Sequence, residues 1–388
     1  MIEYNLIYAG VWGLALLSMV VGSFWKRYLF GGQVAVLSLF VALKFETGYD
    51  WPVYEMHYLL ASMGGSFNLR FEVGYELLVL FFSSIGLGFY QFVGLLNIVE
   101  MILVASVVRY FFPKYSLLLL AIFYAIPDFY LIPSFSLVRQ CLAASLFLYG
   151  VRWYVEGRRV VAWLMFGIAV SFHYSVMGAL FFGILAFWVK LNKNTLLVFF
   201  VLALSLYMFS IDVARLLVTW AVSYIDPKYM IYLERDVYNA SLLYRSVYAI
   251  SSVFAFACIY VVWSRRSFAD EKIARLAPSL FRLAMMGVLI PLLVFGFPTI
   301  STRYQYFFSV FTVGICLLAL ELFKPRDRLV IALVACAVAY VPFYRFLVSP
   351  LSVVYVPYQS QIFYNKSNST GQQRTNDLLN QLDTLWSK

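Results

Sequence analysis

Long apolar runs recur from one end of this 388-residue chain to the other, and they constrain its fold more than any other feature. About 20 consecutive apolar residues make a helix long enough to cross a bilayer. Only 12% of the residues are charged, whereas a soluble domain carries roughly a quarter. The sequence therefore predicts an all-α, polytopic integral membrane protein in which residues 1–388 form a single transmembrane domain. A β-barrel would show short segments of alternating hydrophobicity instead.

We expect about 12 transmembrane helices, over residues 5–24, 28–45, 90–111, 115–132, 136–155, 159–173, 174–190, 195–211, 244–263, 279–297, 304–323 and 328–347. Basic residues collect on the cytoplasmic side of membrane proteins, and basic clusters here follow alternate spans. This pattern places the N-terminus, the loops 45–89 and 211–243, and the tail 348–388 on the outer side. The net charge of +10 follows from this topology. No basic patch on a soluble surface indicates nucleic acid as a partner.

Several segments do not fit a simple series of spans. Residues 74–88 are apolar but too short to cross, so we expect a re-entrant or interfacial outer helix there. Residues 159–190 fit two short helices that meet at an outer turn near His173, with one kinked helix as the alternative. Part of 211–243 is predicted to lie flat on the membrane. In the tail, 365–371 are predicted to be flexible and 376–386 to form a short amphipathic helix.

Carboxylates gather in the stretch from Lys44 to Glu76, between apolar runs. Acids this dense beside membrane spans need water or a polar substrate. Asp50 and Glu72 are the candidate catalytic carboxylates, although a solvated loop would also account for them. The tyrosines of this stretch, including Tyr49, Tyr54 and Tyr75, could stack on sugar rings or belong to the interfacial aromatic belt. His57 has a weaker claim, because we expect it in a wet loop.

Arginines at predicted outer helix ends are the second group of candidates, and we single out Arg139, Arg245 and Arg303. The planar guanidinium grips phosphate oxygens with two hydrogen bonds, which suits a pyrophosphate at the outer leaflet. Snorkelling to lipid headgroups is the alternative. His173 could bond substrate hydroxyls or relay a proton, although a lone histidine often only satisfies a neighbour. Glu100, midway along a span, is interpreted with Asn97 as a structural polar pair.

Five short motifs in order, GYDWPVY, FEVGYELL, LVRQCLA, SFHYSV and TRYQYF, resemble those of the EpsG/Wzy family of polysaccharide repeat-unit polymerases. The family order is G-x-D-x-x-Y, E-x-G-Y, I-R-Q, H-x-S and R-Y-x-x-F. Val138 here replaces the usual isoleucine. The match covers residues 44 to 308 and brings Gln140 and Tyr304 into the set of substrate-binding candidates.

The resemblance implies a reaction outside the bacterial cytoplasmic (inner) membrane, facing the periplasm or the cell exterior. A growing glycan on undecaprenyl pyrophosphate is transferred to the non-reducing sugar of a lipid-linked oligosaccharide repeat unit, in O-antigen or exopolysaccharide synthesis. The implied partners are the lipid-linked donor and acceptor and the bilayer, with a chain-length regulator membrane protein left open. A lipid-linked glycan ligase and a secondary transporter remain as alternatives.

The chemistry of the residues agrees with such a transfer. Pyrophosphate is a good leaving group, so Arg139 and Arg303 could stabilise its charge in place of a general acid. The acceptor hydroxyl needs a base, which Asp50 or Glu72 could supply if burial raised the pKa. We favour Asp50, since Glu72 begins a helix whose dipole would lower its pKa and suit a positioning role. A single displacement would invert the anomeric carbon. The prediction needs no cofactor or metal, although clustered carboxylates could bind one.

Overall fold

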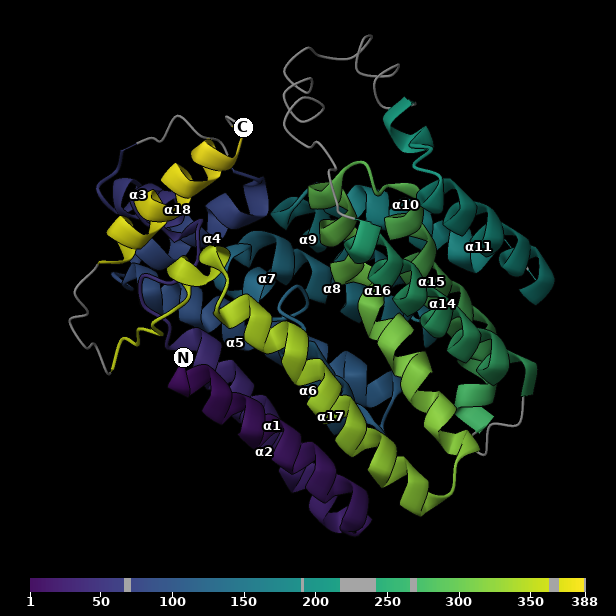
Figure 1. Cartoon of the computed structure of the whole chain (residues 1–388). Coiled ribbons are helices and arrows are strands. Elements are labelled where there is room, and N and C mark those ends of the chain that lie inside the picture. Colours follow the sequence, from purple (N-terminus) through teal and green to yellow (C-terminus); the bar gives the residue numbers. More distant parts are fainter. Residues whose placement is uncertain (66–70, 190–191, 217–241, 266–270, 363–369, 387–388) are drawn as a thin grey trace. The chain divides into compact units, whose positions relative to one another are not determined.

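The computed structural model describes residues 1–65, 71–189, 192–216, 242–265, 271–362 and 370–386 (Figure 1). Over these residues the regular secondary structure is helical, and one isolated antiparallel bridge joins Lys44 to Ser360. The prediction of an all-α fold is confirmed.

The chain divides into two compact units, and each is described here by itself. The first unit combines residues 1–176 with 324–388, and the second contains 177–323. The helix α10 (Ser175–Trp188) begins at the boundary. The predicted single transmembrane domain, with outer loops 45–89 and 211–243 and outer tail 348–388, stays a prediction.

Helices of the first unit come from both ends of the chain. They are α1 (Ile2–Val20), α2 (Ser23–Ala42), α3 (Trp51–Ser62), α4 (Val73–Ser84), α5 (Phe89–Phe111), α6 (Ser116–Ala125), α7 (Leu131–Ser136), α8 (Val138–Val155), α9 (Arg159–Phe172), α17 (Pro325–Leu347), the 3-10 turn η3 (Pro350–Val354) and α18 (Gly371–Trp386). α1 packs on α2 and α6, α2 on α5, α5 on α8, and α8 on α9. α17 returns against α1 and α6, and α18 packs on η3.

The second unit contains α11 (Lys193–Met208), α14 (Leu242–Arg265), α15 (Glu271–Leu293), α16 (Pro298–Leu318) and the 3-10 turn η2 (Ala319–Leu322). α15 packs on α11, α14 and α16. The part of 211–243 predicted to lie flat on the membrane falls mostly outside the described residues, as does the predicted flexible segment near 365.

Tyrosines contribute to the core of the first unit as well as to its surface. The buried Tyr4 hydroxyl donates to the Tyr355 carbonyl at 2.7 Å, and the Tyr124 hydroxyl donates to the Tyr4 carbonyl at 2.8 Å. A buried tyrosine needs such a partner for its hydroxyl. Part of the aromatic content therefore holds helices together and is available neither for an interfacial belt nor for a substrate.

Among the described residues, six helices are long and apolar enough to cross a membrane. They comprise Ile2–Val20, Phe89–Phe111, Arg245–Arg265, Leu276–Leu293, Ile300–Leu322 and Pro325–Leu347. Several of the other predicted spans correspond to shorter apolar helices, so the predicted total of about 12 spans stays a prediction.

The predicted span 115–132 was wrong as a single helix. α6 ends at Ala125, and Ile126 has extended backbone angles (φ −100°, ψ 107°). Pro127 explains the break, because proline disfavours the helical conformation in the residue before it. The short helix α7 follows after Tyr130.

The other irregular segments behave locally as predicted. α4 has 12 residues, which at 1.5 Å per residue is far too short to cross a bilayer. The 159–190 region forms two helices, α9 and α10, that are interrupted at His173. The amphipathic tail helix is α18, although it begins earlier than predicted, at Gly371.

Candidate active site

Gly48, in the first motif, fixes the path of the chain into α3. Its φ of +103° is disfavoured for any residue with a side chain. A Cβ atom there would lie 2.5 Å from the Phe135 carbonyl oxygen and 2.8 Å from Ser136 Oγ. The next amide, of Tyr49, donates to Ser136 Oγ at 3.2 Å. The glycine is therefore required both for its backbone angle and for the close approach to the end of α7.

Asp50 is the N-cap residue of α3, and its side chain makes no capping bond to the helix. It is half-buried. Together with Tyr49 it lines a cavity of about 530 Å³. The two predicted site residues of the first motif therefore face a space that a ligand could enter.

Glu72, the N-cap residue of α4, is positioned by the contact of α4 with α9. A Cβ atom at Gly74 would lie 2.4 Å from Ser171 Oγ and 2.8 Å from the Ser171 carbonyl oxygen. Only glycine lets the two backbones come this close. Glu72, which is 8% exposed, is thereby held beside the end of α9, where Ser171 precedes His173 by two residues.

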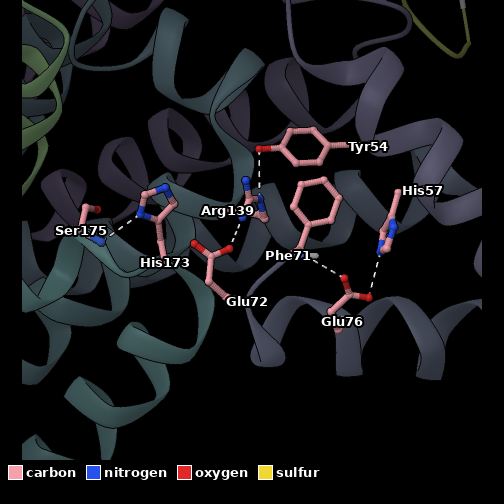
Figure 2. Close-up of polar contacts among 8 residues, drawn as sticks. All are labelled: Tyr54, His57, Phe71, Glu72, Glu76, Arg139, His173 and Ser175. Atoms are coloured by element: carbon pink, nitrogen blue, oxygen red, sulfur yellow. Dashed lines mark hydrogen bonds and ion pairs between the residues drawn. The ribbon is translucent and has the colours of Figure 1, made fainter. Parts of the chain in front are cut away.

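Arg139, at the start of α8, joins two of the motif segments (Figure 2). Its Nη1 atom donates to the Glu72 carboxylate and its Nε atom donates to the Tyr54 hydroxyl at 3.3 Å. The side chain of Arg139 keeps 17% of its surface exposed. The backbone N–H of Tyr54 donates to the Asp50 carbonyl at 3.3 Å, and the charge of Asp50, after burial, helps to raise the pKa of Tyr54. Four residues from three motifs, Asp50, Tyr54, Glu72 and Arg139, thus form one interacting group, which we call the arginine cluster.

Aromatic rings enclose the guanidinium of the arginine cluster. Its Cζ atom lies 4.3 Å from the Phe71 ring centroid, 5.5 Å from that of Tyr54 and 5.8 Å from that of Tyr75. Burial raises the pKa of Tyr54 to about 12, although Arg139 opposes the shift. Tyr54 therefore keeps its hydroxyl proton at physiological pH. Tyr75 is fully buried and its hydroxyl has no partner among the described residues, so in this conformation it is a wall of the cluster.

His57 was underestimated from the sequence. It is 5% exposed within α3, and its Nε2 atom lies 2.9 Å from a carboxylate oxygen of Glu76. The other oxygen of Glu76 accepts the backbone N–H of Phe71 at 3.1 Å (Figure 2). The pair therefore ties α3 to α4 beside the arginine cluster. The sequence contained no signal of this contact, because His57 and Glu76 are 19 positions apart.

His173 interrupts the helix at the junction of α9 and α10. Its Nδ1 atom accepts the backbone N–H of Ser175 at 3.1 Å. A neutral ring that accepts at Nδ1 carries its proton at Nε2. In Figure 2 the imidazole lies beside Glu72, on the side away from Arg139.

Gln140, next to Arg139, is 2% exposed, and both polar atoms of its amide lack a partner among the described residues. Leaving a buried amide unsatisfied costs about 1–3 kcal/mol for each group. Such an amide is a natural binding point for a water molecule or a substrate hydroxyl.

The remaining candidates belong to the second unit. Arg245 donates to the carbonyl oxygens of Tyr207 and Met208 at the end of α11, the latter at 2.8 Å. Arg303 is half-buried and has no hydrogen-bond or ion-pair partner among the residues that the structure describes. Tyr304 is half-buried, and a Cβ atom at Gly178 would lie 1.9 Å from its hydroxyl. The predicted pairing of Arg303 with Arg139 stays a prediction, since they belong to different units.

The buried polar group around Glu100 differs from the predicted pair with Asn97. Glu100 accepts from Ser134 Oγ at 2.7 Å and from Cys141 Sγ at 3.0 Å, whereas Asn97 Nδ2 lies 3.5 Å from the Val41 carbonyl oxygen. Lys44 donates to the carbonyls of Ser134 and Phe135. The group therefore holds α5, α7 and α8 together.

Comparison with known proteins places these motifs in a family. A family profile described as the EpsG family matches residues 27–360. No similar chain was found among curated proteins or among solved structures. The match covers more than half of the chain and contains every predicted site residue. The chain therefore belongs to the EpsG family, a family of polysaccharide polymerase-like membrane proteins.

Proposed function

We propose that this protein polymerises lipid-linked oligosaccharide repeat units. A growing glycan is transferred from undecaprenyl pyrophosphate to the non-reducing sugar of another lipid-linked repeat, at the outer face of a bacterial cytoplasmic membrane. Membership of the EpsG family supports a polysaccharide polymerase in general. The observation that carries the specific proposal is the arginine cluster, which unites Asp50, Tyr54, Glu72 and Arg139.

Arg139 is the proposed ligand of the donor pyrophosphate. A guanidinium has five N–H donors. The bond to Glu72 uses one N–H of Nη1, and the bond to Tyr54 uses the N–H of Nε. The others have no partner among the described residues, and part of the side chain is exposed. Glu72 and Tyr54 hold the planar group in one orientation, so the remaining donors are preorganised for the negative charge that develops on the leaving oxygen.

Asp50 is the proposed general base. It takes the proton of the acceptor hydroxyl while that oxygen forms a bond to the anomeric carbon of the donor. The bond from this carbon to the pyrophosphate oxygen breaks, and undecaprenyl pyrophosphate leaves with the electron pair. One displacement of this kind inverts the anomeric carbon. Base assistance typically contributes about 10²–10⁴-fold to the rate.

The other predicted residues take supporting roles in this proposal. Tyr49, beside Asp50 in the cavity, contacts the acceptor. His173 bonds a substrate hydroxyl or relays a proton through Nε2, since Nδ1 is occupied by the Ser175 amide. Gln140 offers its unsatisfied amide to a hydroxyl. In the second unit, binding of Arg303 and Arg245 to the donor pyrophosphate stays a prediction, and so does binding of Tyr304 to the substrate.

Purified protein, supplied with a lipid-linked oligosaccharide repeat in proteoliposomes, tests the proposal. We expect a ladder of products that differ by one repeat unit. Transfer of a single glycan to an unrelated acceptor, without a ladder, would instead indicate a ligase. Movement of the substrate across the bilayer, with no new glycosidic bond, would indicate a transporter and would overturn the proposal.

A further inference from the structure

Part of the cavity beside Asp50 is lined by residues that lie outside the five sequence motifs. Its volume is about 530 Å³, within the usual range for small-molecule sites. Besides the start of α3, its lining includes Ile132 of α7, Phe346 of α17, Leu351 of η3 and Tyr355, which follows η3. α18 contributes the rest of the lining, with Gln372, Thr375, Asn376, Leu378 and Leu379.

The wall formed by α18 presents an amide pair to the cavity. Gln372 Nε2 donates to Asn376 Oδ1 at 3.2 Å, one helical turn away. The amide oxygen of Gln372 and the amide nitrogen of Asn376 have no other partner among the described residues. The pair therefore offers the amide oxygen of Gln372 as an acceptor and the NH2 group of Asn376 as a donor, while Leu378 and Leu379 add apolar surface.

The lining is mostly apolar and carries polar groups from Asp50, Gln372 and Asn376. A sugar ring has apolar faces and hydroxyls at its edge, which match leucine surface and amide groups respectively. The Asp50 carboxylate repels an anion, which argues against the pyrophosphate as occupant. A hydrocarbon chain would strip water from the amides and the carboxylate without replacing their hydrogen bonds.

α18 is anchored firmly to the loop that precedes Asp50. Arg374, 2% exposed, donates to the carbonyls of Pro357 and Glu46, both at 2.9 Å, and to Gln359 Oε1 at 2.7 Å. The amide of Gly371 donates to the Glu46 carboxylate at 2.7 Å. These bonds fix the position of the amide pair relative to Asp50, as a binding site requires.

α18 begins after residue 360, where the match to the EpsG family ends. We infer that α18 is the specificity wall of the acceptor site: Gln372 and Asn376 bind hydroxyls of the acceptor's terminal sugar beside the base Asp50. This inference rests on the proposed function. It assigns the selection of the acceptor sugar to an element outside the shared motifs.

An acceptor that cannot serve as donor tests the inference. The repeat-unit oligosaccharide on an octyl aglycone lacks pyrophosphate, so it can only accept. For Asn376→Ala and Gln372→Ala we expect the acceptor KM to rise about three- to tenfold, the effect of one net hydrogen bond. The donor KM should stay within about twofold, because the inference places neither residue at the donor and because changes at exposed positions rarely affect folding.

Asn380→Ala is the matched control. Asn380 is exposed on the same helix, one turn beyond Asn376, and does not line the cavity. A wild-type acceptor KM in both α18 variants, with a normal ladder from the unaltered protein, would overturn the inference and leave the proposed function standing. Absence of any ladder from the unaltered protein would instead defeat the proposed function. If the two α18 variants lost affinity for sugar-free octyl alcohol to the same extent as for the octyl-linked acceptor, the cavity would be assigned to lipid.

Discussion

Arginines predicted for the same role have very different surroundings in the two units. In the first unit, Arg139 bonds to side chains, Glu72 and Tyr54, and retains unoccupied donors. In the second, Arg245 bonds to backbone carbonyls at the end of α11. A cation there stabilises the negative end of the helix dipole. Arg303 has no partner among the described residues.

Gly74, in the second motif of the first unit, and Gly178 of the second unit make close contacts of different kinds. Gly74 of the first unit faces backbone as well as a hydroxyl, at Ser171. Gly178 of the second unit faces the end of a single side chain, Tyr304. Backbone cannot move without moving a helix, whereas a side chain can turn. The comparison teaches that backbone packing at Gly74 holds the segment of Glu72 in place, and the predictions below test that contrast.

The largest effect is expected for Asp50→Asn, which keeps the shape of the side chain but removes its basicity. Polymer formation should fall about 10²–10⁴-fold while donor affinity persists. In the second unit, Tyr304→Phe should cost far less, because it removes at most one substrate hydrogen bond. Rates and donor affinities of the purified variants are the measurement. Near-normal polymer from Asp50→Asn, with none from a folded Glu72→Gln that still binds donor, would reverse the roles of the two carboxylates.

Arg139→Lys should lower polymer formation about 10–100-fold, because lysine keeps the charge but loses the fork of donors. We expect Arg303→Lys to lower activity too. Only Arg139→Lys should also lower the melting temperature, because only Arg139 bonds to neighbouring side chains. Thermal unfolding and turnover are measured on the same samples. Wild-type turnover in both variants would contradict this role and would favour the alternative, in which these arginines contact lipid headgroups.

Gly74→Ala should destabilise the protein by about 1–3 kcal/mol, the usual range for overpacking, because the added methyl group meets the Ser171 backbone. Gly178→Ala should cost less, since the Tyr304 side chain can shift. Gly167→Ala is the control, because nothing lies within 4 Å of an added Cβ there. Equal melting temperatures for Gly74→Ala and Gly167→Ala would contradict the tight contact of α4 with α9.

The smallest effect is expected for Arg245→Met. Removing the cap of α11 should cost about 1–2 kcal/mol of stability, and the folded fraction should keep its turnover. Activity per folded molecule, measured beside thermal unfolding, separates the two roles. Lost turnover at unchanged stability would support the predicted contact of Arg245 with pyrophosphate and would remove the contrast with Arg139.

Much of the architecture could be predicted from the sequence because apolarity and backbone preferences are local properties. Apolar runs predicted a helical membrane protein, and the short length of 74–88 predicted the short helix α4. The break near His173 and the amphipathic helix α18 were also predicted. The error at 115–132 came from giving hydrophobicity more weight than Pro127, although the proline signal was local too.

The sequence by itself determined the helical class, the order of the motifs and the residue types that could bind phosphate or take a proton. Only the tertiary structure decided which of those residues meet. Arg139 and Glu72 are 67 positions apart, and Arg374 and Glu46 are 328 apart. The buried state of His57, the cap formed by Arg245 and the cavity wall formed by α18 have the same origin. The physical reason is that a hydrogen bond or a cavity depends on where packed backbones bring distant side chains, whereas helix formation depends on neighbours along the chain.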